Sequence, residues 1–158
     1  SPVAADGVVF VTSGYRGSRL AAIDLSSAHD DISGSSAVRW SVDRDTPYVP
    51  SPLLHDGLLY VLKSNNGILS VFDAGTGERH YGPERLPGIR SVYASPVAAA
   101  GRVYVTSREG TTLVLRAGPT LEVLATNTLD DEFDASPAIV DDEIYLRGRR
   151  HFYAIGAP

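Results

Sequence analysis

Apolar and polar residues alternate in short blocks along the chain, and these blocks recur in one register. Four Ser-Pro pairs stand at positions 1, 51, 95 and 136, which gives spacings of 50, 44 and 41 residues. A turn pair such as Asp56-Gly57 follows five residues after each serine, and a short apolar run comes next. Nine residues after each serine stands an aromatic residue: Phe10, Tyr60, Tyr104 and Tyr145. The chain therefore contains four copies of one structural unit.

Each unit is predicted to form four short strands joined by turns. The apolar runs are rich in Val, Ile, Leu and Tyr, and the turns in Gly, Asp, Asn and Ser, which is typical of antiparallel strands. In the second unit, apolar residues at 58–61 and 68–72 flank a turn at 64–67, and a last strand is expected at 78–81. The third unit should end in a strand at 121–126. No stretch keeps the period of a helix.

Units of four strands and this length predict an all-β fold, a β-propeller built from antiparallel blades. Proline has no N–H for a strand ladder, so the strand after each Ser-Pro should be an innermost edge strand beside the channel. A sandwich would not need a repeat in this register. The blades are expected at about 1–47, 48–91, 92–133 and 134–158, within one propeller segment that covers 1–158. The last blade lacks its outer strand.

The repeat carries a family resemblance. The pattern Ser-Pro-Val-x-x-Asp-Gly-x-Val-[Phe/Tyr]-Val, then Gly-x-Leu-x-x-x-Asp-x-x-Thr-Gly, then a Trp or Tyr, resembles the pyrroloquinoline-quinone-type (PQQ-like) β-propeller repeat. Quinoprotein dehydrogenases and BamB-like proteins share that repeat. The match is clearest at 51–81 and 136–155. It is interrupted by an insertion at 28–37 before Trp40, and by Arg116 where the repeat has an aspartate.

The resemblance implies a ring of about seven or eight blades, so the chain looks like the C-terminal half of a larger propeller. Two interpretations stay open. The chain is a segment of a longer propeller, or it folds as about four blades that a second copy or another protein completes. An open arc would expose the apolar faces of its first and last blades, which favours association. A closed ring of four blades is also possible, but tight.

Composition excludes several functions. Fourteen Lys and Arg against nineteen Asp and Glu leave a net charge of −5, which argues against nucleic-acid binding through bulk charge. The absence of cysteine excludes disulfides, thiolate metal sites and a cysteine nucleophile. No apolar run approaches the roughly 20 residues that span a membrane. Because the chain does not begin with Met, it gives no information about a signal peptide.

Candidate binding residues lie in two sets of loops. With the strands of a blade named A to D from the channel outward, ligands of propellers usually sit on the face that carries the D–A and B–C loops. The D–A loops here are rich in carboxylates, and the B–C loops are rich in arginines. Such a mixed polar face suits a polar ligand or a protein partner. The alternative is that these are solvated charges that pair weakly with one another. The candidates are Tyr48, Arg90, Tyr93 and Asp134 on D–A loops, and Arg16, Arg108 and Arg149 on B–C loops. Tyr93 and Asp134 are expected near the channel.

No metal or catalytic site is predicted. The run Asp130-Asp131-Glu132-x-Asp134 resembles a calcium-binding carboxylate cluster, but it lacks the glycine and the spacing of an EF-hand loop. The four histidines do not stand at metal-ligand spacing. Neither a G-x-S-x-G nucleophile motif nor a phosphate-binding loop is present.

The repeat is compatible with two main functions, because fold alone does not decide activity. The first is a scaffold or binding module without catalysis and without a cofactor. The second is a fragment of a quinoprotein dehydrogenase, an oxidoreductase that would use PQQ with calcium. Such enzymes are expected to have a stacking Trp and often a cysteine pair, whereas Trp40 lies on an outer strand and cysteine is absent. A sensor or accessory domain of a secreted protein is a third possibility. We expect the binding module, in a periplasmic or secreted setting that the resemblance implies.

Overall fold

The computed structural model describes residues 1–156, which form fifteen β-strands and no helix. The strands are β1 (Val3–Ala5), β2 (Val8–Ser13), β3 (Arg19–Asp24), β4 (Val38–Val42), β5 (Leu53–His55), β6 (Leu58–Leu62), β7 (Ile68–Asp73), β8 (Arg79–Arg85), β9 (Val97–Ala99), β10 (Arg102–Thr106), β11 (Thr111–Arg116), β12 (Val123–Thr128), β13 (Ala138–Val140), β14 (Glu143–Arg147) and β15 (Phe152–Gly156).

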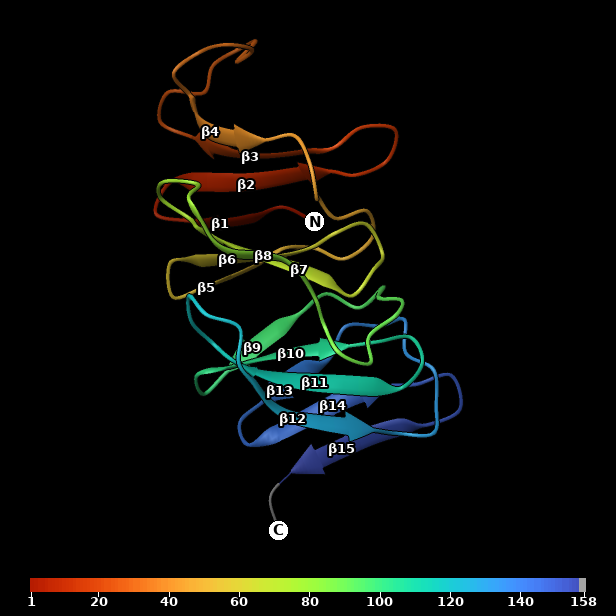
Figure 1. Ribbon diagram of the computed structural model, residues 1–158. Helices are drawn as coiled ribbons and strands as arrows, with labels where there is room; N and C mark the ends of the chain where they lie inside the picture. Colours follow the sequence, from red (N-terminus) through yellow and green to blue (C-terminus); the bar gives the residue numbers. More distant parts are fainter. Residues whose placement is uncertain (157–158) are drawn as a thin grey trace.

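The strands pair in chain order into four antiparallel sheets. Three sheets have four strands, and the last, β13-β14-β15, has three. The strand after each Ser-Pro is a sheet edge, as predicted, and β1, β5, β9 and β13 contact one another in sequence along the inner side. The sheets stack one after another, with the two chain ends at opposite ends of the stack (Figure 1). This all-β architecture is a partial β-propeller, so the predicted fold class is confirmed.

The ring is open between the first and last sheets. Within residues 1–156, β1 makes no contact with β13. The closed ring of four blades considered from the sequence is therefore not formed. One face of the first sheet and one face of the last sheet have no neighbouring sheet in this chain.

Apolar cores fill the spaces between the first and second sheets and between the second and third sheets. Neighbouring residues of a strand point to opposite faces, so the second sheet contributes to both cores. Phe10 and Leu20 of the first sheet pack with Leu59, Val61 and Phe72 of the second. The second core joins the other face of the second sheet to the third sheet; its fully buried members include Tyr60, Leu62, Leu69, Val103, Val105, Leu113 and Leu115. Burial of each large side chain contributes about 1.5–3 kcal/mol.

The single tryptophan ties the first blade to the second. The indole Nε1 of Trp40 donates to the carbonyl oxygen of Ala74 at 3.0 Å, and its ring stacks on Phe72 with centroids 6.5 Å apart. Trp40 therefore has a structural role at the contact between the first two blades. The repeated aromatic position is buried at Phe10 and Tyr60 and half-buried at Tyr104 and Tyr145.

Two outer strands differ from their predicted bounds. The structure has β8 at Arg79–Arg85 and β12 at Val123–Thr128, where the sequence predicted 78–81 and 121–126. Both strands pair with their neighbours through register shifts, in β7 between Leu69 and Phe72 and in β11 at Val114/Leu115. Such a bulge places two residues opposite one, so hydrophobic alternation alone misplaces the strand ends.

A chain of hydrogen bonds links the Ser-Pro motifs. The N-terminal amine of Ser1 donates to the Ser51 hydroxyl at 2.6 Å. The backbone N–H of Ser51 donates to the Ser95 hydroxyl at 2.9 Å, and that of Ser95 to the Ser136 hydroxyl at 2.8 Å. Each serine is thus joined to the serine of the next blade, always in the same direction. The sequence explained the proline of the motif and left the role of the serine unassigned.

Candidate functional site

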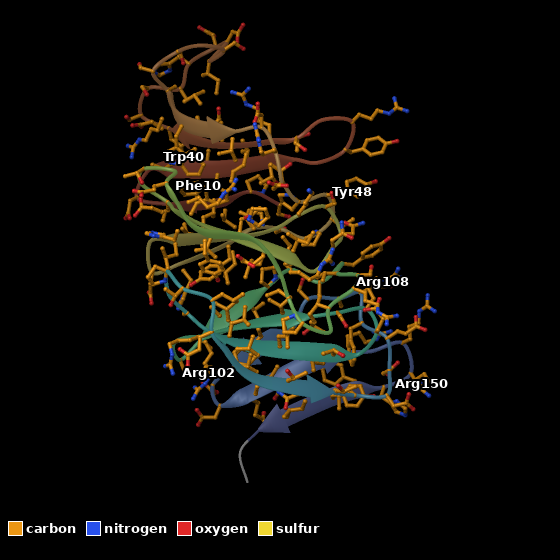
Figure 2. The ribbon with its side chains drawn as sticks, in the orientation of Figure 1. Phe10, Trp40, Tyr48, Arg102, Arg108 and Arg150 are labelled. Carbon is orange, nitrogen blue, oxygen red and sulfur yellow. The ribbon has the colours of Figure 1, made fainter. Side chains whose placement is uncertain are left out.

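The D–A and B–C loops gather on one side of the molecule. Tyr48, Arg108 and Arg150 lie along that side, whereas Arg102 and Trp40 lie along the other (Figure 2). We call the first side the loop face; its segments are 43–52, 86–96 and 129–137 between blades, and 14–18, 63–67, 107–110 and 148–151 within blades. It is the side on which the sequence placed the candidate residues.

Backbone hydrogen bonds fix the two kinds of loop to each other. The N–H of Ser64 donates to the carbonyl of Thr46 at 2.9 Å. The N–H of Arg108 donates in the same way to Ser91 at 2.9 Å, and the N–H of Arg149 to Glu132 at 3.0 Å. Each bond joins a B–C loop to the D–A loop that enters the same blade. The side chains of these three B–C loops therefore project from a backbone that is hydrogen-bonded to the neighbouring D–A loop.

Arg108 is the centre of the first side-chain group. Its Nε donates to Asp134 Oδ1 at 2.5 Å, and its guanidinium carbon lies 4.1 Å from the ring centroid of Tyr93. The hydrogen bond from Arg108 to Asp134 raises the pKa of the Arg108 guanidinium. These three predicted residues come from three separate loops, and the structure brings them together. We call them the Arg108 group.

A second group forms around Tyr15, which the sequence did not single out. The rings of Tyr15 and Tyr48 stack with centroids 5.4 Å apart, and the guanidinium of Arg16 lies 5.4 Å from the Tyr15 centroid. Tyr15 is 63% exposed and Tyr48 51%. The one available signal was an aromatic residue inside the glycine-bearing turn Gly14-Tyr15-Arg16-Gly17. We call these residues the Tyr15 group.

The remaining two predicted residues, Arg149 and Arg90, belong to neither group. Arg149 pairs with Glu132, with Nη1 and Oε2 3.1 Å apart, and both side chains are exposed. Arg90 is exposed and has no hydrogen bond or ion pair within residues 1–156. The loop face thus holds five of the seven candidates in two groups and two as separate arginines.

A polar cleft of about 940 Å³ lies between the B–C loops of the last two blades. Its lining is Arg108, Glu109, Thr128, Leu129, Asp130, Asp131, Glu132, Arg149 and Arg150. Arg150 pairs with Asp130 at 3.1 Å, just as Arg149 pairs with Glu132. Most of the charge on the cleft wall is therefore balanced by a neighbouring opposite charge. The wall presents hydrogen-bond donors from the arginines and acceptors from the carboxylates.

Asp131 is a structural residue within the carboxylate run. Its carboxylate is buried and accepts the backbone N–H groups of Glu132, Arg150 and His151 at 2.8 to 3.1 Å. Burial alone would raise the pKa of this carboxyl, but these three N–H groups and the hydroxyl of Tyr153 hold it well below its ordinary value. The carboxylate thereby fixes the last B–C loop.

The carboxylate run does not assemble into a metal site. The Cβ of any residue larger than glycine at Gly148 would clash with Asp131 Oδ2, so the loop closes tightly over the carboxylate. Among residues 1–156, no three His, Cys, Asp or Glu side chains come together in a way that would hold a metal ion.

Comparisons with known proteins support the fold. No protein-family model matches the chain, and no curated protein matches it in sequence. Among solved structures, the computationally designed Ika4 protein is similar with a TM-score of 0.73 and 14% identity, over 99% of this chain and 89% of Ika4. The designed Ika8 protein gives 0.71 and 14%, over 99% of this chain but 45% of Ika8. BamB from Moraxella catarrhalis gives 0.49 and 14%, over 97% of this chain and 56% of BamB. At these identities the likeness concerns the fold.

Proposed function

We propose that the chain is a non-catalytic scaffold of the PQQ-like propeller type that binds a protein partner through its loop face. The observation that supports this most is the pairing of exposed aromatic rings with arginines. In the Tyr15 group and the Arg108 group, a guanidinium lies on or beside a tyrosine ring of the loop face. Tyrosine and arginine are enriched at the centres of protein interfaces, where a planar ring and a planar cation bury much area at little entropic cost.

The distribution of charge favours a protein over a small charged ligand. The cleft arginines already pair with carboxylates, so a small anion would have to displace Glu132 or Asp130 to reach them. A protein surface can instead contact the exposed tyrosines. It can also form hydrogen bonds with the atoms of these ion pairs that face solvent, without separating the pairs. The Tyr15 group comes from the first blade and the loop that enters the second, and the Arg108 group comes from the third blade and the loops on either side of it. A partner that contacts both groups would therefore span several blades.

The setting and the assembly follow from the resemblance and the open arc. We place the protein outside the cytoplasm of a bacterium, in the periplasm or secreted, as PQQ-like repeats suggest. The described residues include no helix able to cross a membrane. The open ends of the arc would be covered by a further partner, either another protein or a second copy of the chain.

Affinity capture with matched variants tests the loop-face proposal. The immobilised chain is offered to a cell-envelope extract of a bacterium that encodes it, and bound proteins are quantified by mass spectrometry. The captured amount of a partner that binds the loop face should fall at least about tenfold with the Tyr48→Ala, Arg108→Ala double variant. It should be retained by Arg102→Ala, which removes an exposed arginine on the opposite side (Figure 2). Equal capture by both variants would contradict the proposal.

A ligand test separates the scaffold from the dehydrogenase. Pyrroloquinoline quinone with Ca²⁺ is added to the chain, and the melting temperature is measured over a concentration series. A ligand that binds the folded state raises the melting temperature in a saturable way. We expect no rise; a saturable rise that needs both components would overturn the non-catalytic proposal in favour of the quinoprotein dehydrogenase.

A further inference from the structure

The last sheet exposes residues at positions that are buried in the first two units of the repeat. Phe152 pairs across strands with Arg147, so it holds the position that Leu20 and Leu69 hold in the first two sheets. Leu20 and Leu69 are 0% exposed between sheets, whereas Phe152 is 66% exposed. Tyr145 lies beside it, with ring centroids 5.9 Å apart. The last sheet thus presents an aromatic face of the kind that the next sheet buries in the first two units, whereas the equivalent residues of the third unit, Tyr104 and Thr112, are half-buried.

The first sheet exposes the opposite half of the same interface. Val9 and Val11 hold the positions of Leu59 and Val61, which are buried against the first sheet at 0% and 1% exposure. Both valines are only half-buried. They lie with Ile23 on a face that no sheet of this chain covers. A hollow of about 460 Å³ lies between this face and the insertion at 28–37; Val11 and Ile23 line it from the sheet, and Ile32 lines it from the insertion.

The serine chain has complementary open ends at the same two sheets. It runs in one direction, from the N–H of one serine to the hydroxyl of the next. Within residues 1–156, the backbone N–H of Ser136 has no acceptor and the hydroxyl of Ser1 has no donor. The last blade therefore ends in a free donor, and the first blade begins with a free acceptor.

We infer that a second copy of this chain docks head to tail, with the last sheet of each copy packed against the first sheet of the other. Phe152 and Tyr145 of one copy would cover the valine face of its partner, and Ser136 N–H would donate to the partner's Ser1 hydroxyl. The occupant is a second copy because one chain carries both halves of an interface that it already forms internally. Four sheets from each copy would close one ring of eight.

Substitutions on the uncovered faces of the first and last sheets test this inference. The mass of the 158-residue chain is measured by light scattering and by sedimentation over a concentration series, and we expect twice 16.8 kDa. Phe152→Glu and Val11→Arg should each give monomers. Because the interface occurs twice in the ring, each substitution acts twice, and we expect the dissociation constant to rise at least about hundredfold. Leu124→Glu, at an exposed apolar position of β12 outside both faces, should leave the dimer intact.

Mixing the two monomeric variants distinguishes head-to-tail docking from other contacts. In a mixed ring, one interface pairs the new carboxylate of the Phe152→Glu chain with the new guanidinium of the Val11→Arg chain, and the other interface is unaltered. The mixture should therefore regain the dimer mass. Ala4→Arg, at an exposed position on the same face of β1, replaces Val11→Arg if that variant loses its strand circular-dichroism signal.

Several outcomes would overturn the inference. They are a monomeric wild-type chain, an open-ended series of larger species, a Phe152→Glu variant that stays dimeric, or a mixture that fails to regain the dimer. A variant on the first sheet that stays dimeric while Phe152→Glu dissociates would indicate contact between two last sheets instead. None of the substituted residues belongs to the loop face. A failure of the dimer inference therefore leaves the proposed binding function standing, and a failure of the binding function leaves the dimer inference standing.

Discussion

The backbone N–H of Ser51 donates to the hydroxyl of Ser95, 44 residues further along the chain, at 2.9 Å. Each serine stands just before an innermost strand, at a sheet edge where no neighbouring strand accepts its N–H. The hydroxyl of the next blade supplies that acceptor. The adjacent proline has no N–H and needs none. The Ser-Pro motif thus satisfies the inner edge of each blade and connects successive blades.

Removal of one serine hydroxyl from this series of hydrogen bonds should destabilise the fold by a predictable amount. Ser95→Ala leaves the Ser51 N–H without its acceptor, and we expect the free energy of unfolding to fall by about 1 kcal/mol. Urea denaturation at a fixed protein concentration measures this. Ser36→Ala is the control, because Ser36 is an exposed loop serine, and its effect should stay within about 0.5 kcal/mol. Equal effects of the two substitutions would show that the hydroxyl chain contributes nothing.

A pair of glycines separates backbone strain from contact with Trp40. Gly77 has φ +75° and Gly57 has φ +73°, so alanine at either site costs about 1–2 kcal/mol of strain. Only at Gly77 does an added Cβ meet the indole, 2.6 Å from Trp40 Cδ2, whereas nothing lies within 4 Å at Gly57. We expect Gly77→Ala to cost about 2 kcal/mol more than Gly57→Ala. It alone should change the fluorescence of the single tryptophan; an unchanged spectrum would contradict the blade contact.

The sequence predicted the fold because one register recurs. The Ser-Pro pair, the turn glycine and the aromatic position are local signals, and four copies of them mark the same edge, turn and core positions. The outer strands β8 and β12 were placed less well, because their bulges depend on how they pair with β7 and β11. The open ring was also beyond local signals, since it depends on how far the sheets turn relative to one another.

The candidate site was predictable as a set of loops, and less so as a set of contacts. Charge and aromatic content indicated Arg108, Tyr93 and Asp134 separately, but their meeting depends on three loops that the blades bring together. Tyr15 was missed because a tyrosine in a turn gives no sign of its partner Tyr48. Asp131 was grouped with its acidic neighbours, although burial gives it a different role.

Two buried tyrosine hydroxyls should respond oppositely to removal. The hydroxyl of Tyr60 accepts the backbone N–H of Gly118 at 2.8 Å, so Tyr60→Phe leaves that N–H unpaired and should cost about 1–2 kcal/mol. The buried hydroxyl of Tyr81 has no partner within residues 1–156, so Tyr81→Phe should be neutral or stabilising by up to about 1 kcal/mol. Urea denaturation compares the two variants, each of which is the control for the other. A loss in Tyr81→Phe as large as in Tyr60→Phe would contradict this assignment.

The Asp131 carboxylate should make the fold sensitive to acid. Three backbone N–H groups and Tyr153 hold its pKa below the ordinary value of 3.8. The unfolded chain therefore binds this proton more readily than the folded chain, and the free energy of unfolding rises with pH over this range. The stabilisation of the fold by ionised Asp131 is complete above the pKa of this carboxyl in the unfolded chain, about 3.9. It is lost as the pH falls through the lower pKa of the carboxyl in the folded chain.

Asp131→Asn should remove this dependence. The amide cannot ionise, and its NH₂ would face backbone N–H donors, so the variant should have a lower free energy of unfolding at neutral pH. Its free energy of unfolding should also change less than that of the wild type as the pH falls below about 5, the range in which aspartates titrate. Chemical denaturation at a series of pH values measures both effects. Asp142→Asn, at an exposed position with no contact to the last B–C loop, should keep the wild-type dependence. An Asp131→Asn variant with the wild-type acid response would show that other carboxylates cause it.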